Sequence, residues 1–143
     1  MAKETSTRLH ASCAAVGARA VLILGSAGAG KSALTLQLMA YGAILVADDQ
    51  TIVQLRDGWP VARAPDRLRG LIEARGIGVL AADPAAPTRV HLVIDMDHIE
   101  TDRLPPDRTE VLLGQPLPLL HKTESPDFPA AILQYLKAGK VDR

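Results

Sequence analysis

A short glycine-rich run contains the residues of this chain that are best suited to hold a phosphate. Residues 25–32 match the pattern G-x-x-x-x-G-K-[ST], known as the P-loop. Its glycines allow the backbone to turn N–H groups onto phosphate oxygens. Lys31 supplies a mobile positive charge for the outer phosphates, and the Ser32 hydroxyl is a ligand that Mg²⁺ accepts. The predicted nucleotide-binding residues are Gly25, Ser26, Ala27, Gly28, Ala29, Gly30, Lys31 and Ser32.

The segments on either side of this run are suited to position it. Residues 20–24 are apolar and typical of a buried strand. Residues 32–41 have a helical period that places Leu34 and Leu38 on one face. A helix that begins here directs its positive N-terminal end at a bound anion. A glycine-rich loop without a ligand is the alternative, but the order of strand, loop, Lys-Ser and helix favours a phosphate site.

Composition and charge narrow the class of protein. The chain has 143 residues, 48% hydrophobic and 22% charged, which is consistent with one globular domain over residues 1–143. Its formal net charge is zero, so we do not expect a nucleic-acid-binding surface. Cys13 is the single cysteine, which excludes an internal disulfide, and its apolar surroundings predict a small buried hydrophobe.

The N-terminal residues and the hydropathy of the chain indicate which cellular compartment to expect. Residues 1–8 are polar, so we expect a flexible tail there and no signal peptide. No apolar run has the length of a membrane span, and we therefore expect no membrane partner. The expected location is the cytoplasm, where ATP and reduced thiols are found.

After the first predicted helix, strands predominate. Asp57-Gly58 predicts a tight hairpin turn, residues 65–68 a short helical turn, and residues 130–136 a C-terminal helix. This order differs from the regular alternation of a doubly wound parallel sheet. The predicted fold class is therefore α/β, with a mixed sheet flanked by helices. The predicted strands are residues 9–16, 20–24, 43–47, 51–55, 59–64, 71–74, 78–81, 90–96 and 111–113.

Three further segments carry a resemblance to a known family. They are Leu9-His10, residues 42–49 (Gly-Ala-Ile-Leu-Val-Ala-Asp-Asp) and residues 72–79 (Ile-Glu-Ala-Arg-Gly-Ile-Gly-Val). With the glycine-rich run they resemble the catalytic domain of the bacterial HPr kinase/phosphorylase family, over residues 9–103. The resemblance implies a P-loop domain akin to phosphoenolpyruvate carboxykinase.

The family's activity is implied in the same way. Its members use ATP and Mg²⁺ to phosphorylate a serine of HPr, a small carrier of the phosphoenolpyruvate-dependent phosphotransferase system. Many also remove that phosphate by transferring it to inorganic phosphate. The resemblance therefore implies an HPr-like carrier as the partner and a homo-oligomer, commonly a hexamer.

The resemblance also assigns residue roles. His10 matches the family's active-site histidine and is expected to contact Asp49 or a phosphate. Lys31 matches the residue on the phosphates, and Ser32 and Glu73 match the metal ligands. Arg103 matches a later active-site arginine.

Two adjacent carboxylates end the predicted strand at residues 43–47. Asp49 matches the family's proton acceptor in phosphorylation and proton donor in the reverse reaction. A serine hydroxyl is a poor nucleophile and benefits from a carboxylate that accepts its proton. Neighbouring strand residues point to opposite faces, so the two aspartates cannot perform the same task. We therefore assign Asp49 as the base and expect Asp48 to orient the site or contact metal-bound water.

The sequence departs from the family pattern in two places. Typical members carry an extra N-terminal domain, which we expect to be absent from a short form. They also carry a V-x-P-G-R-N-like segment linked to dephosphorylation, and residues 117–123 (Leu-Pro-Leu-Leu-His-Lys-Thr) lack its Arg-Asn pair. We therefore expect kinase activity with weak or absent phosphorolysis.

Two other functions remain open at this point. A small-molecule P-loop kinase is one, although such enzymes usually have a lid and regular strand–helix alternation. A non-catalytic, ATP-sensing module is the other, and it would be favoured if the aspartate or the metal ligand were missing. Lys31, Ser32, Asp49 and Glu73 are all present. The substitution Asp49→Ala separates these cases, because only an enzyme would lose phosphoryl transfer while still binding ATP.

Overall fold

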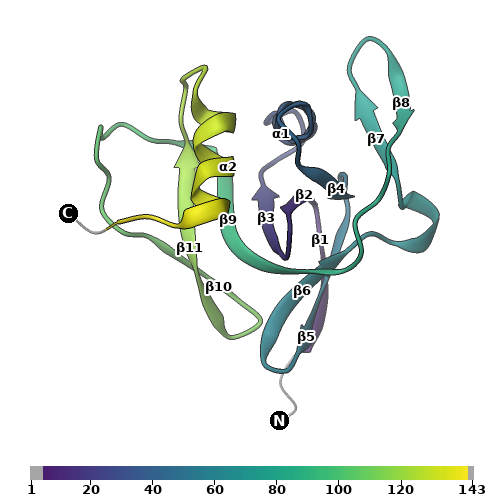
Figure 1. Ribbon diagram of the computed structural model, residues 1–143, viewed down its shortest axis with the longest axis horizontal. Helices are drawn as coiled ribbons and strands as arrows, with labels where there is room; N and C mark the ends of the chain where they lie inside the picture. Colours follow the sequence, from purple (N-terminus) through teal and green to yellow (C-terminus); the bar gives the residue numbers. More distant parts are fainter. Residues whose placement is uncertain (1–4, 142–143) are drawn as a thin grey trace.

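A curled mixed sheet of nine strands forms the body of the chain, in a computed structural model that describes residues 5–141 (Figure 1). The strand order is β1-β5-β6-β9-β3-β2-β4, with β11 beside β9 and β10 beside β11. The predicted α/β class with a mixed sheet is confirmed. The strands are β1 (Ser6–Leu9), β2 (Ala11–Val16), β3 (Arg19–Leu24), β4 (Ile44–Ala47), β5 (Thr51–Arg56), β6 (Trp59–Arg63), β9 (Thr88–Ile99), β10 (Thr109–Leu112) and β11 (Gln115–Lys122).

The centre of the sheet is parallel. β9 lies between β3 and β11 and runs parallel to both, so the carboxyl ends of these three strands meet at one edge. Leu24 of β3 and His121 of β11 are both in register with Asp95 of β9. Both faces of β3 are buried, with Leu22 in one apolar cluster and Val21 in the other. This explains why its sequence is an unbroken apolar run.

Two helices lie against the sheet. α1 (Lys31–Ala40) and α2 (Phe128–Ala138) are neighbours in space (Figure 1). Leu38 and Ile132 are fully buried in the apolar cluster that the helices share with β3 and β9. Among residues 5–141, no helix is both long enough and apolar enough to cross a bilayer.

A small hairpin stands apart from the main sheet. The short helical turn η1 (Asp66–Leu68) leads into β7 (Leu71–Ala74) and β8 (Gly78–Ala81), which pair only with each other in a two-stranded sheet (Figure 1). β7 contacts α1, so the hairpin lies beside the helix that follows the glycine-rich run. The bounds of both strands are those predicted from the sequence.

The first strands differ from the prediction. Residues 6–8 of the expected flexible tail instead belong to a strand, because Ser6–Leu9 form β1 and pair antiparallel with β5. Residues 1–4 of that expected tail lie outside the described part of the chain. The single predicted strand over residues 9–16 is divided at His10, where the chain bends between β1 and β2. This bend allows β1 to pair with β5 while β2 pairs with β3 and β4.

Other local predictions are confirmed. Asp57 and Gly58 both have positive φ, 52° and 75°, as a tight hairpin turn between β5 and β6 requires. Cys13 is fully buried, and burial raises the pKa of its thiol because the charged form would lose its solvation. Cys13 is therefore packed as an apolar side chain.

β11 was not expected from the sequence. Pro116 and Pro118 in its first half argue against a strand, because proline cannot donate a backbone hydrogen bond. In the structure this half pairs only with the short strand β10, and residues 119–122, which contain no proline, pair with β9. β11 therefore adds a third parallel strand to the edge where the glycine-rich run begins.

Candidate functional site

The glycine-rich run connects β3 to α1 at the carboxyl edge of the sheet. Gly30 is the residue before α1 and has a left-handed φ of 99°, which glycine adopts without strain. A Cβ at Gly25 would lie 3.0 Å from the Cβ atoms of Ala29 and Met96, so only glycine fits there without movement. The first turn of α1 contains no acidic residue, which leaves its positive end available to an anion.

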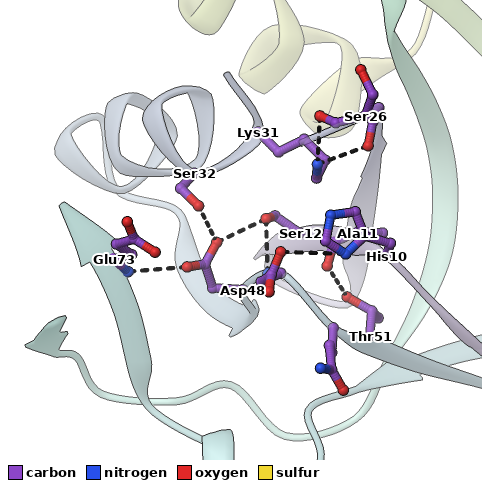
Figure 2. Close-up of polar contacts among 12 residues, drawn as sticks. His10, Ala11, Ser12, Ser26, Lys31, Ser32, Asp48, Thr51 and Glu73 are labelled. Atoms are coloured by element: carbon purple, nitrogen blue, oxygen red, sulfur yellow. Dashed lines mark hydrogen bonds and ion pairs between the residues drawn. The ribbon is translucent and has the colours of Figure 1, made fainter. Parts of the chain in front are cut away.

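Lys31 folds back over this loop. Its ammonium group donates hydrogen bonds to the backbone oxygens of Gly25 (2.7 Å) and Ser26 (3.0 Å) (Figure 2). An ammonium group has three donors, so one N–H remains for a phosphate oxygen. The predicted phosphate-contacting lysine is thus placed with its charge inside the loop.

Asp48 is the centre of a hydrogen-bond network. Its Oδ1 accepts hydrogen bonds from the hydroxyls of Ser12 (2.8 Å) and Ser32 (2.6 Å), and its Oδ2 accepts the backbone N–H of Glu73 (3.0 Å) (Figure 2). The residue is buried, and these donors replace the water that a carboxylate would lose. Asp48 therefore fixes the Ser32 hydroxyl and connects β2, α1 and β7.

Asp49 has different surroundings from its neighbour. Its side chain is 61% exposed, and its Oδ1 lies 3.4 Å from Nδ1 of His10. Its backbone has a φ of 65°, a left-handed conformation uncommon for residues other than glycine, and its N–H donates to Ser12 Oγ (3.2 Å). Asp49 thus offers a carboxylate to solvent with His10 beside it, while Asp48 is directed into the chain.

The remaining two candidates are connected to the network to different degrees. Glu73 lies on β7 and is exposed to solvent. Its backbone N–H donates a hydrogen bond to the Asp48 carboxylate. Arg103 lies in the segment between β9 and β10, which an ion pair between Arg108 and Glu100 (3.2 Å) closes. Within the described residues 5–141, Arg103 is exposed and forms no hydrogen bond or ion pair with another candidate.

Two polar residues of the site were missed in the sequence. Ser12 is fully buried, and its hydroxyl joins the Asp48 side chain to the Asp49 backbone. A signal was available for Ser12, since a regular strand over the predicted residues 9–16 would place it on the same face as His10. The second residue, Asp97, follows the apolar run of β9, which ends beside the glycine-rich run.

Asp97 holds the glycine-rich run at its second residue. Both of its carboxylate oxygens lie 3.0 Å from the backbone nitrogen of Ser26, and Oδ1 accepts the Ser26 hydroxyl at 2.8 Å. The Ser26 N–H, followed by the Ser26 hydroxyl, lowers the pKa of the Asp97 carboxyl by stabilising its charged form. Asp97 therefore keeps one amide of the loop occupied by a carboxylate.

Taken together, the site has the parts needed for phosphoryl chemistry. It contains a cradle of backbone amides with a lysine, a hydroxyl held by a buried carboxylate, and an exposed carboxylate beside a histidine. Mg²⁺ uses oxygen ligands together with substrate phosphates, and the Ser32 hydroxyl and the Glu73 carboxylate are of that type. The residues present therefore fit a nucleotide with its magnesium ion.

Comparison with known proteins gives one consistent family. The family model described as the HPr serine kinase C-terminal domain matches residues 1–111. The HPr kinase/phosphorylase of Clostridium beijerinckii is 31% identical over 103 residues, which are 67% of this chain and 34% of that protein. The HPr kinase/phosphorylase of Caldicellulosiruptor bescii is 44% identical over 72 residues, which are 50% of this chain and 23% of that protein. The chain thus matches about a third or less of the length of these relatives.

A solved structure extends the similarity over most of the chain. The Hpr(Ser) kinase/phosphatase from Coxiella burnetii matches with a TM-score of 0.75 and 26% sequence identity. The match covers 92% of this chain and 88% of the chain in that structure. The structural match therefore covers more of the chain than the family model, which matches residues 1–111.

Proposed function

Because this chain belongs to the HPr serine kinase C-terminal domain family, we propose that it is an ATP-dependent protein kinase that phosphorylates a serine of an HPr-like phosphocarrier. The observation that carries the proposal is the contrast between the paired aspartates. Asp48 accepts three hydrogen bonds in the interior, whereas Asp49 lies exposed with His10 as its neighbour. Only Asp49 is available to a hydroxyl that arrives from another protein.

In the proposed reaction, the γ-phosphoryl group of ATP is transferred to a serine of the carrier. The serine oxygen of the carrier forms a bond to the γ-phosphorus of ATP, and the bond from that phosphorus to the bridging oxygen breaks. ADP leaves with the bonding electron pair, and the serine proton passes to the Asp49 carboxylate. His10, with Nδ1 3.4 Å from Asp49 Oδ1, orients that carboxylate. Phosphoryl transfer depends chiefly on such positioning and on charge stabilisation.

The glycine-rich run and Lys31 bind the phosphates in this proposal. Lys31 has one N–H beyond its two backbone hydrogen bonds, and the amides at the start of α1 add partial positive charge. Ser32 and Glu73 would hold the magnesium ion, which when bound neutralises phosphate charge. Asp48 keeps the Ser32 hydroxyl in place through their 2.6 Å hydrogen bond. Arg103 is proposed to complete the site.

The test is transfer of labelled phosphate from ATP·Mg²⁺ to a purified HPr-type carrier, with the modified residue assigned by mass spectrometry. The wild type is expected to label one carrier serine, and Lys31→Ala and Asp49→Ala are expected to abolish labelling. Asp49→Ala should still bind ATP, because within residues 5–141 Asp49 forms no hydrogen bond or ion pair with the glycine-rich run. ATP binding without labelling by the wild type would overturn the kinase proposal in favour of a sensor or a different acceptor.

We also propose that phosphorolysis is weak or absent. The support is the sequence of residues 117–123, which lacks the Arg-Asn pair of the family's dephosphorylation segment. Residues 117–122 lie in β11. Phosphorylated carrier incubated with the chain and inorganic phosphate should therefore retain its phosphate. Rapid loss of the phosphate would contradict this proposal.

The remaining features of the family are proposed on resemblance. We propose one catalytic unit over residues 1–143, of the phosphoenolpyruvate carboxykinase-like P-loop type, acting in the cytoplasm as a homo-oligomer, most simply a hexamer. The oligomer has structural support in the β7–β8 hairpin. Ile77 and Val79 of this hairpin are 78% and 66% exposed, which is high for large apolar side chains.

A further inference from the structure

β9 is interrupted close to the glycine-rich run. In its pairing with β11, His121 lies opposite Asp95 while the next residue, Lys122, lies opposite Ile99. Three residues of β9 therefore bulge out of the ladder. In a regular strand, residues three positions apart point to opposite faces, but here His98 returns to Asp95. Bulges of this kind re-aim side chains and are frequent beside functional sites.

The bulge brings together three side chains with metal-ligating atoms. His98 Nδ1 lies 2.7 Å from Asp95 Oδ2, and the rings of His98 and His121 stack with centroids 5.3 Å apart. One ligand atom from each of Asp95, His98 and His121 lies within 4.8 Å of the others. In a tetrahedral zinc site, bonds of about 2.0–2.1 Å place the ligand atoms about 3.3 Å apart. The cluster needs only small side-chain movements to reach that geometry.

We propose that Asp95, His98 and His121 bind a transition-metal ion, with Zn²⁺ as the best fit. Two imidazoles and one carboxylate suit zinc and its neighbours, whereas Mg²⁺ and Ca²⁺ take oxygen ligands. The His98 side chain is 67% exposed, so water has access to the fourth position. Three protein ligands with an open fourth position are typical of exchangeable or reactive zinc rather than of closed structural sites.

This site is separate from the proposed magnesium ligands. Ser32 and Glu73 lie on α1 and β7, whereas the three histidine and aspartate ligands lie on β9 and β11. A chain of contacts nevertheless connects the metal site to the glycine-rich run. Asp95 Oδ1 accepts the N–H of Asp97 (2.8 Å), and the Asp97 carboxylate accepts the N–H of Ser26. A bound ion would therefore fix the segment that holds the loop.

The test is calorimetric titration of the full chain, freed of metal with a chelator and without a histidine tag, using Zn²⁺ alone. The wild type is expected to bind one equivalent. His121→Ala and Asp95→Asn should weaken the affinity at least about 100-fold. His91→Ala is the matched control, because it also removes one of four histidines and lies on β9, but its ring packs against Trp59 at a tilt of 36°, outside the cluster.

A second measurement guards against misfolded variants. Co²⁺ in place of Zn²⁺ should give the visible absorption of a low-coordinate complex in the wild type and in His91→Ala, and this band should be lost in His98→Ala. His98 is largely exposed, so its truncation leaves the fold intact by circular dichroism. The proposal is overturned if the wild type binds no stoichiometric Zn²⁺, or if the cluster variants bind it as well as His91→Ala does. Neither measurement uses nucleotide or carrier, so the result is independent of the proposed kinase activity.

Discussion

Ser12 shows how a single buried hydroxyl can control two carboxylates. It donates to Asp48 Oδ1 and accepts the backbone N–H of Asp49, so it fixes the side chain of one and the backbone of the other. Asp49 needs this support because a φ of 65° is costly for a residue with a Cβ. Both aspartates lie beyond the end of β4 at Ala47, so the predicted strand alternation does not apply to them. The difference in their exposure depends instead on Ser12 and on the left-handed backbone of Asp49.

The substitution Ser12→Ala should accordingly affect both stability and transfer. Loss of a buried hydrogen bond to a carboxylate should lower the free energy of unfolding by about 1–3 kcal/mol, and misplacement of Asp49 should slow transfer about 10- to 100-fold. Thr51→Val is the matched control, because the buried Thr51 hydroxyl binds only the backbone oxygen of Ala11. It should cost stability with no change in the transfer rate. Equal rates for Ser12→Ala and Thr51→Val would contradict this role of Ser12.

The Asp97 carboxylate should make the stability of the chain depend on pH. Its pKa is lowered in the folded state, first by the Ser26 N–H, so its contribution is present above its ordinary pKa and is lost as the pH falls through the folded-state pKa. Asp97→Asn should therefore be less stable than the wild type at about pH 7, and this difference should shrink towards about pH 3. Urea unfolding of both proteins at the two pH values measures this difference in the free energy of unfolding. A difference that stays constant with pH would argue against this assignment.

Among the elements, β11 contributes both a parallel strand beside β9 and a side chain buried in the core. Leu117 is only 1% exposed and belongs to the main apolar cluster, although the strand contains two prolines. Leu117→Ala should lower the free energy of unfolding by about 2–5 kcal/mol. Val111→Ala on the paired strand β10, where the side chain is exposed, should change it by less than about 0.5 kcal/mol. Similar values for the two variants in denaturant unfolding would contradict the placement of β11.

Local patterns in the sequence predicted most of the fold. The strand–loop–helix around Lys31, the Asp57-Gly58 turn and the individual strands β7 and β8 each depend on neighbouring residues, so their periodicity and turn chemistry were sufficient. β11 was missed because Pro116 and Pro118, which have no backbone N–H to donate, argue against a strand. In the structure both prolines lie in the half of β11 that pairs with β10. That pairing is a tertiary property which no local pattern records.

The same distinction applies to the site. Lys31, Ser32, Asp48 and Asp49 were proposed as site residues because they lie in contiguous motifs, and the structure joins two of them by a hydrogen bond from Ser32 to Asp48. The connection of Asp97 to Ser26 spans 71 residues and depends on β9 lying beside β3. The meeting of Asp95, His98 and His121 required both the bulge in β9 and the unexpected strand β11.

On the scale of the whole molecule, the exposed apolar residues of the β7–β8 hairpin are not covered by any other segment within the described residues 5–141. The hairpin stands away from the main sheet (Figure 1). Its large apolar side chains Ile77 and Val79 are exposed. Ile77→Glu combined with Val79→Glu should therefore reduce the mass measured by light scattering, since each charge would have to be buried in the assembly. The secondary structure should be unchanged, because both side chains are exposed in the single chain. An unaltered mass would place the assembly surface elsewhere.

In the proposed kinase, Asp49 accepts the proton of a carrier serine while the glycine-rich run and Lys31 hold ATP. The most direct measurement is the single-turnover rate of phosphoryl transfer from ATP·Mg²⁺ to an HPr-type carrier by Asp49→Asn. Asparagine tolerates the left-handed backbone but cannot accept the proton, so the rate should fall at least about 100-fold with ATP affinity retained. Asp57→Asn, at a second positive-φ aspartate in the β5–β6 turn, should keep the wild-type rate. Transfer by Asp49→Asn at the wild-type rate would show that Asp49 is not the proton acceptor.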